Sequence, residues 1–386
     1  MKNFKLMLSA CIAAVVFTSC EKEELVPQNT RMKSVEVSLE NAAFSATRGD
    51  AGDKIKAGQA VIVNDLKFFL LDNAGKEYSA KVSDGSKEAQ SYWTAKELET
   101  NGLDFAFHYV DHGCSKIVAV ANVGDPNLSY EKFLQNQNLN IDNEQDSKSL
   151  RLFAQATLTP NGEQHNNKNT DGTTYVSDVY TADLLLKPRI SRFEVDGFRV
   201  KFDATNPKYT DIKFTDMLFD HYPTMTSLLT GEESTSHTVH IADLNVQSTV
   251  YNWFNNTDKP EAWYWDSFEA TVSPTVPAAS CDSLAYHTFA GVTIPRLVIK
   301  LLVDGQPAYL YSKGFYSTTN LTGGEPTLIE ALEEGCIYRM SAAGATDEEK
   351  DGYIPIDEED LDPMDRCLEI KVDVHKWVVD FVYPEF

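Results

Sequence analysis

Apolar side chains recur at every second position in short runs of this chain, and polar turns separate the runs. The pattern is clearest near the C-terminal end, where Leu368, Ile370, Val372 and Val374 alternate with charged or polar residues. Alternation of this kind predicts strands with one buried face, because successive side chains of a strand point to opposite sides. Such runs return along the whole chain, and runs with helical spacing are few. An all-β fold is therefore predicted.

Strand pairs with clear turn residues occur in both halves of the chain. Residues 61–78 are predicted to form two strands about a turn at 72–75, and residues 294–315 a hairpin about Asp304-Gly305. A chain of 386 residues is long enough for two domains. Many short strands and long polar loops predict one β-sandwich in each half, an N-terminal domain at 49–195 and a C-terminal domain at 196–386.

Residue type predicts further elements between these pairs. Residues 105–110 and 116–126 are expected to pair, and the second is apolar on both faces, as in a central strand of a sandwich. One helix is expected near residues 131–137. The polar, Asn-rich residues 135–143 and 161–172 predict long surface loops.

The first residues are typical of an export signal. Lys2 and Lys5 precede an apolar run at 6–17, which is too short for a membrane-spanning helix. The run leads through small residues directly to Cys20, as in a bacterial lipoprotein signal. Residues 1–19 are therefore predicted to be removed and Cys20 to carry lipid; the alternative is an ordinary signal peptide with an incidental cysteine. No later apolar run approaches about 18 residues, so lipid is the only membrane attachment expected.

Charge and motifs argue against several classes of function. Asp and Glu number 58 against 34 Lys and Arg, and the net charge of −24 argues against nucleic acid or anionic lipid as a partner. The sequence contains no Walker loop, GxSxG elbow, HExxH motif or helix with paired carboxylates. No catalytic residue, cofactor or enzyme activity is therefore predicted.

Three groups of residues allow a binding role, and each has a plainer interpretation. His108 and His112 would share one face of a strand, but without further ligands nearby two solvated or hydrogen-bonded histidines are favoured over a metal site. The acidic residues 347–365 lack the glycine turn of a calcium loop, so a solvated tether is favoured over a Ca²⁺ site. Aromatic residues in the segment 251–268 suit a sugar, although packing over a sandwich edge is commoner: Trp253, Trp263 and Trp265.

Six cysteines occur in the chain. Cys11 leaves with the signal peptide and Cys20 takes the lipid. The remaining four allow three disulfide pairings in an oxidising compartment, or four buried free thiols, and the sequence leaves both open: Cys114, Cys281, Cys336 and Cys367.

Several motifs follow one another in a fixed order. They are the lipoprotein signal, a strand with Val35, Val37 and Leu39 that precedes Arg48, the terminal strand pair, and three internal stretches: VNDLKFFLLD (63–72), KIVAVANV (116–123) and LLKPRISRFEV (185–195). Together they resemble the fimbrillins, the subunits of Bacteroidales type V pili. Residues 21–24 also resemble the export signal of surface-exposed Bacteroidetes lipoproteins, although a solvated linker has the same composition.

The resemblance implies two tandem β-sandwich domains of transthyretin-like, Greek-key type. It implies export of a lipoprotein precursor through the periplasm to the outer membrane and cell surface. A trypsin-like protease would then cut between Arg48 and Gly49, where better-known members carry Ala after the cut. The propeptide, residues 20–48, would leave with the first strand. A neighbour's C-terminal strand would fill the groove.

Residues 368–386 are the predicted donor. After His375-Lys376 the alternation changes phase, so two strand segments with separate apolar faces are expected: Leu368, Ile370, Val372 and Val374, then Trp377, Val379, Phe381 and Tyr383. The alternative is that the strand closes its own sheet. The expected partners are neighbouring subunits, the outer membrane through the precursor's lipid, and a host glycan or protein. The rival function is a monomeric surface lipoprotein that binds glycan through residues 251–268.

Overall fold

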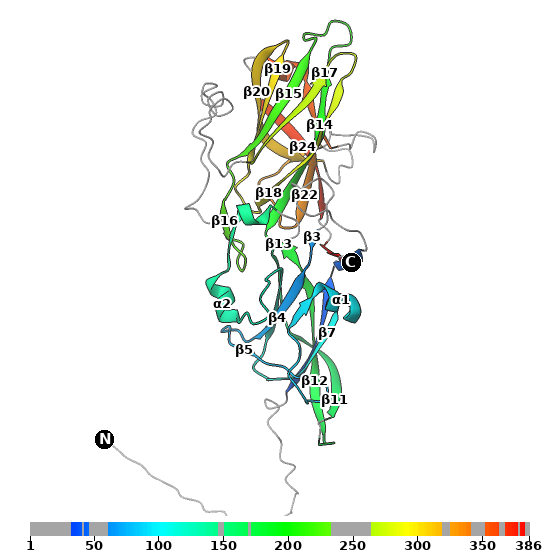
Figure 1. Ribbon diagram of the computed structural model, residues 1–386, viewed down its shortest axis with the longest axis vertical. Coiled ribbons are helices and arrows are strands. Elements are labelled where there is room, and N and C mark those ends of the chain that lie inside the picture. Colours follow the sequence, from blue (N-terminus) through cyan, green and yellow to red (C-terminus); the bar gives the residue numbers. More distant parts are fainter. Residues whose placement is uncertain are drawn as a thin grey trace, which may run out of the picture.

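The computed structural model describes residues 32–40, 42–45, 61–145, 150–168, 171–232, 264–318, 325–340, 352–362, 367–376 and 379–382. Its regular structure is nearly all strand, and the sheets form two β-sandwiches that follow one another along the long axis of the molecule (Figure 1). The predicted all-β fold with tandem sandwiches is confirmed. Cys20, Arg48 and Gly49 lie outside the described residues.

The N-terminal sandwich consists of two sheets. The four-stranded sheet has the order β11 (Thr159–Lys168), β12 (Thr174–Leu185), β1 (Lys33–Glu40) and β7 (Asp104–Val110). The six-stranded sheet has the order β13 (Lys187–Pro188), β10 (Leu152–Thr157), β8 (Lys116–Ala121), β4 (Asp65–Leu71) and β5 (Glu77–Tyr78), with β6 (Tyr92–Thr94) also paired to β4. The sheets meet where Phe68 packs against Phe105 and Phe107, at ring-centroid distances of 4.7 and 5.6 Å.

The C-terminal sandwich is one long hydrogen-bonded path of strands. Its order is β17 (Tyr264–Val272), β15 (Ile212–Asp220), β19 (Arg296–Val303), β20 (Gln306–Ser317), β24 (Cys367–Lys376), β22 (Cys336–Met340), β14 (Ile190–Lys201) and β18 (Ala278–Phe289). β21 (Thr327–Leu328) pairs with β20, and β23 (Tyr353–Asp357) pairs with β14. In the core the ring of Phe193 lies 5.2 Å from that of Phe219 and 4.8 Å from that of Phe315.

Two small sheets form ladders separate from the main sheets. β9 (Asn138–Asn140) pairs with β16 (Met225–Ser227), and β25 (Val379–Val382) lies between β2 (Ala42–Ser45) and β3 (Val61–Ile62). Within the described residues the helical elements are α1 (Ala95–Asn101), α2 (Tyr130–Gln135) and the 3₁₀ turns η2 (Ile141–Glu144) and η4 (Glu358–Leu361). Among the described residues, no helix combines the length and the apolar character needed to cross a membrane.

The buried apolar residues form two clusters. The first consists mostly of residues up to Ile190 and the second begins at Phe193. Tyr222, Leu228 and Phe289 are exceptions, because they follow Phe193 in the chain but belong to the first cluster. Each sandwich therefore has its own core, and a few side chains from the C-terminal half of the chain pack in the core of the N-terminal sandwich. The exact domain limits stay predictions.

Both predicted turns are confirmed. Asp72 closes the first, because its Oδ1 accepts the N–H groups of Ala74 and Lys76 at 2.8 and 2.9 Å. Asp304 and Gly305 have φ values of 47° and 77°, which suit the tight hairpin of β19 and β20. The side chains at these turns determine the backbone locally, so the sequence alone reveals them.

The expected pairing of residues 105–110 with 116–126 is wrong. β7 belongs to the four-stranded sheet and β8 to the six-stranded one, so the short loop between them crosses from one sheet to the other. β8 is central, as predicted, since β4 and β10 flank it. The helix near 131–137 is present as α2, and α1 was missed although Thr94 and Glu97 form a capping box at its start.

The prediction of an acidic tether is wrong for the described part of residues 347–365. β23 pairs in parallel with β14 and buries Ile354 and Ile356, while Leu361 of η4 is also buried. The Glu358 side chain is buried and accepts backbone N–H groups 2.8 and 2.9 Å away, which compensates its loss of water. The negative charge of this segment predicts exposure to water, but its alternating apolar residues are buried against the C-terminal sandwich.

Candidate functional site

β1 occupies an interior position in the N-terminal sheet. It runs parallel to β12 on one side and antiparallel to β7 on the other (Figure 1). Val35, Val37 and Leu39 are 0, 2 and 9% exposed, so the alternation of the sequence places them in the core. β7 is an edge strand of this sheet, and its neighbour in the sheet is β1.

Removal of β1 would open a groove. β12 and β7 would lie about 10 Å apart, twice the usual spacing of about 4.8 Å between neighbouring strands. Both would present unpaired N–H and C=O groups, as edge strands do. The three buried side chains of β1 each contribute about 1.5–3 kcal/mol through burial, and their loss would expose the core behind them. An open groove of this kind fits a single replacement strand with the same alternation.

A buried polar cluster holds the beginning of β1. Ser34 Oγ lies 3.0 Å from His108 Nδ1 on β7 and 2.5 Å from Ser177 Oγ on β12. Asn167 Nδ2 donates to Ser177 Oγ at 2.9 Å, and the rings of His165 and His108 lie 4.8 Å apart. Burial, and then the neighbouring His165, lower the pKa of His108. No sequence motif indicates this cluster, because its members come from four strands, and Ser34 and His108 are distant in the chain from Asn167 and Ser177.

His108 and His112 do not share a site. His108 belongs to the Ser34 cluster, whereas the side chain of His112 is half exposed and its Nδ1 lies 3.5 Å from Asp111 Oδ1. The hydrogen-bonded interpretation therefore describes His108. Across the described residues, no three His, Cys, Asp or Glu side chains are grouped as metal ligands would be. The described cysteine side chains Cys114, Cys281 and Cys336 are buried free thiols, and that of Cys367 lies outside the described residues.

The C-terminal strand divides into two elements, as the change of phase predicts. β24 lies between β20 and β22 of its own sandwich, and Leu368, Ile370 and Val372 are 3, 1 and 0% exposed there. Val374 is partly buried beside them. β24 therefore closes its own sheet in this structure, which was the alternative to a donor role.

β25 follows β24 but lies against the N-terminal half of the chain. It pairs with β2 and β3, and Figure 1 shows it in red beside β3, at the level where the two sandwiches meet. Trp377 and Tyr383 lie outside the described residues, as do the side chains of Val379 and Phe381. Trp253 and Trp263 also lie outside, and only the backbone of Trp265, in β17, is described.

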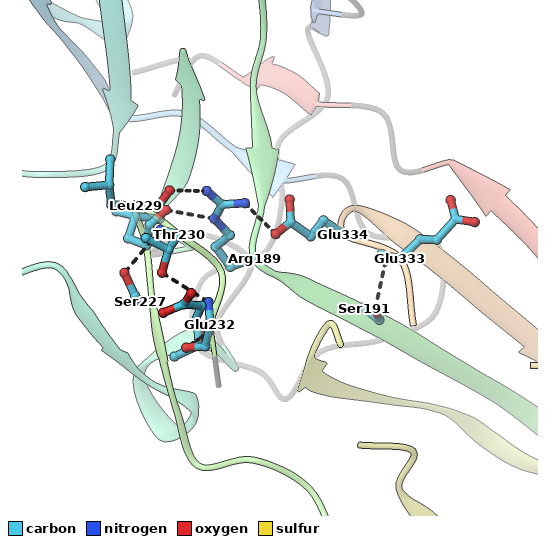
Figure 2. A network of polar contacts seen from close by, with 10 residues as sticks. Arg189, Ser191, Ser227, Leu229, Thr230, Glu232, Glu333 and Glu334 are labelled. Carbon is cyan, nitrogen blue, oxygen red and sulfur yellow. Dashed lines mark hydrogen bonds and ion pairs between the residues drawn. The ribbon is translucent and has the colours of Figure 1, made fainter. Parts of the chain in front are cut away.

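Arg189 ties the two halves together. It lies between β13 and β14, where the chain passes from one sandwich to the other, and its guanidinium reaches two segments (Figure 2). Nε and Nη2 donate to the carbonyls of Leu228 and Leu229 at 2.7 and 2.8 Å, and Nη1 pairs with Glu334. Three donors of one planar group fix both segments at once, which a lysine could not do.

A second set of contacts joins the same halves. η2 lies against β18, where Gln145 Nε2 donates to the His287 carbonyl at 3.1 Å and His287 Nδ1 lies 2.7 Å from the Glu144 carbonyl. β9 of the N-terminal half pairs with β16 of the C-terminal half. Burial raises the pKa of Glu144 to about 7 and lowers that of His287 to about 3. Burial therefore favours the neutral form of both side chains where the halves meet, and Glu144 keeps its proton up to about pH 7.

Glu144→Gln should change how the stability of this joint depends on pH. The folded protein holds the Glu144 proton up to about pH 7, whereas the unfolded chain releases it near 4.5, so the parent loses stability as pH rises between these values. Glutamine mimics the protonated form. The unfolding free energy of the variant minus that of the parent should therefore increase by about 2 kcal/mol when the pH is raised from 5 to 6.5. Urea unfolding at both pH values measures this difference.

Glu131→Gln is the matched control, because Glu131 is an exposed carboxylate on α2. Its unfolding free energy relative to the parent should change little over the same range, since an exposed charge contributes little to stability. Parallel pH curves for the parent and Glu144→Gln would show that Glu144 titrates as it does in the unfolded chain.

Comparisons with known proteins gave similarity to solved structures alone. No family model and no curated protein matches the chain. A candidate cell adhesion protein from Parabacteroides distasonis ATCC 8503 is 14% identical with a TM-score of 0.47, over 91% of this chain and 98% of that one. A fimbrilin from Porphyromonas gingivalis W83 is 11% identical with a TM-score of 0.47, over 91% and 99%. A candidate cell adhesion protein from Bacteroides eggerthii DSM 20697 is 12% identical with a TM-score of 0.45, over 92% and 98%. At this level of identity and TM-score the similarity assigns no function to this chain.

Proposed function

We propose that this protein is a structural subunit of a cell-surface fimbrium and not an enzyme. The precursor is exported as a lipoprotein through Cys20 and is cut after Arg48. The subunits then polymerise by strand exchange, in which the C-terminal tail of one subunit fills the groove that β1 leaves in the next. The fimbrium stands on the outer membrane and adheres to a host glycan or protein.

The position of β1 carries this proposal. A strand near the N-terminal end is inserted between β7 and β12, buries three apolar side chains, and precedes Arg48 by only a few residues. A cut after Arg48 would separate β1 from the rest of the chain without breaking any other strand of the sandwich. Few arrangements let a single cut open a complete strand position in a folded sheet.

We restrict the proposed donor to the residues after Lys376. β24 is flanked on both sides in its own sheet, and its departure would expose Leu368, Ile370 and Val372. Donation by the following segment leaves that core intact. We therefore assign the inserted side chains to the second apolar set: Trp377, Val379, Phe381 and Tyr383.

A stalk subunit suits this architecture. The tail provides a donor and β1 marks an acceptor, so each subunit can both give and receive a strand. Arg189 and the β9–β16 pair hold the two sandwiches as one body. A fibre of such subunits is stiff, because its joints are strand insertions and not flexible linkers.

Limited digestion of the purified precursor with an arginine-specific protease tests this function. The expected product begins at Gly49 and forms a ladder of oligomers that resists detergent until it is heated, because a strand with several buried side chains dissociates slowly. Electron microscopy should show fibres of constant width.

The undigested precursor serves as the control and should stay monomeric. A digest that begins at Gly49 and has released residues 32–48, yet remains monomeric at high concentration, would contradict the proposal. Binding of the undigested monomer on a glycan array would instead favour the rival function.

A further inference from the structure

β25 joins the two sides of the cleavage site. β2 ends at Ser45, before Arg48, and β3 begins at Val61, after it. Both pair in parallel with β25, which lies between them. The proposed donor tail is therefore held in part by the segment that the protease removes.

The two partners of β25 are unequal. β2 faces the whole strand, with Ala42 opposite Val379 and Ser45 opposite Val382. β3 faces only Val379 and Asp380. Without β2, the strand would keep two opposed residues on one side and none on the other, and even a complete two-stranded ribbon is marginally stable in water.

We propose that the propeptide is a latch on the donor tail as well as a plug in the acceptor groove. The inference rests on the proposed function: β1 blocks the groove, and β2 blocks the strand that would fill a neighbour's groove. A single cut after Arg48 releases both, because β1 and β2 leave on one peptide. The uncut precursor can then neither accept nor donate, so a subunit in transit cannot cap a growing fibre at either end.

The arrangement gives the cut a direct effect on a distant part of the sequence. Residues 42–45 and 379–382 are at opposite ends of the chain, yet they share one ladder. Loss of β2 removes the longer of the two ladders of β25 and leaves only its two-residue pairing with β3, without any change in the C-terminal sandwich. β24 keeps both of its neighbours, β20 and β22, so the release stops at Lys376.

Cleavage at two alternative positions separates the latch from the plug. One variant of the full chain carries a site-specific protease sequence at Asn41, between β1 and β2, and another carries it at residues 46–48, after β2. The released peptide is removed in the same way from both. The first product loses β1 alone and keeps β2 joined to β3; the second loses both strands.

Hydrogen exchange of the Val379–Val382 amides reads the latch directly. Exchange should stay slow in the precursor and in the product cut at Asn41, and should become at least about tenfold faster in the product cut after β2. The amides of Ile370 and Val372 in β24 are the internal reference and should stay slow in all three. Equal exchange of Val379–Val382 in the two cut products, whether slow or fast, would overturn the latch.

Peptide binding distinguishes failure of the latch from failure of the proposed function. A synthetic peptide of residues 377–386 should bind to both cut products, because both lack β1, and should not bind to the precursor. Only the product cut after β2 should extend into fibres. If neither product binds the peptide while the exchange difference is present, the latch stands and strand exchange is the part that fails.

Discussion

Replacement of Arg48 by alanine is expected to abolish assembly, with polymer yield at least about 100-fold below that of the parent. The uncut chain keeps β1 between β7 and β12, so no groove is available. The same variant should be the more stable monomer. Val35, Val37 and Leu39 stay buried, and their joint contribution of about 5–9 kcal/mol is an upper limit for the stability that processing removes. Gel analysis of sheared fibres and thermal unfolding of the monomer measure the two effects.

Arg31→Ala is the matched control, because this arginine lies on the other side of β1 in the sequence. Its loss should leave the cut after Arg48 and the assembly unchanged. Normal fibres from Arg48→Ala, or mature subunits that begin at a residue before β1, would show that β1 is not removed for assembly. The proposed function would then lose its main support.

Deletion of residues 377–386 is expected to give a folded subunit that is processed but does not extend a fibre. β24 ends at Lys376, so the C-terminal sandwich stays complete and its melting temperature should change by no more than a few degrees. The groove left by β1 is untouched, so the truncated subunit should still accept the tail of an intact one. It should therefore terminate fibres in mixtures, and mean fibre length should fall in proportion to its share.

A single substitution in the tail should act almost as strongly. Trp377→Asp places a charge where the inserted strand needs its largest apolar side chain, at a cost of several kcal/mol, so the affinity of the tail should fall by at least about 1000-fold. Trp377→Phe is the matched control and should retain assembly. Titration of the cleaved subunit with peptides of residues 377–386 measures both. Two results with the protein that lacks residues 377–386 would contradict the donor role. If that protein is degraded or unfolds, residues 377–386 belong to its own core. If it polymerises after the cut at Arg48, they are not the donor.

Local chemistry in the sequence determined much of this fold. Asp72 and Asp304 specify their turns through their own side chains and backbone, and the alternation of Leu368, Ile370 and Val372 specifies which face of β24 is buried. The phase change after His375-Lys376 likewise predicts two strands in place of one. These features involve residues within a few positions of each other, so a linear pattern contains them.

Partnership between distant strands was decided only by the tertiary structure. The sequence shows that residues 105–110 and 116–121 are strands, but not that they belong to opposite sheets, because either pairing would satisfy the same alternation. The same limit applied to the donor. Its alternation suits a neighbour's groove as well as its own sheet, and the structure places β24 in its own sheet.

Burial of charge was the other point that the sequence could not decide. Residues 353–361 look solvated because they are acidic, yet Ile354, Ile356 and Leu361 are buried and Glu358 accepts the N–H groups of Asp203 and Lys208. The cluster of Ser34, His108, Asn167 and Ser177 also depends on side chains from separate strands. A charged or polar residue is buried only when distant groups satisfy its hydrogen bonds, and those partners exist only after the chain has folded.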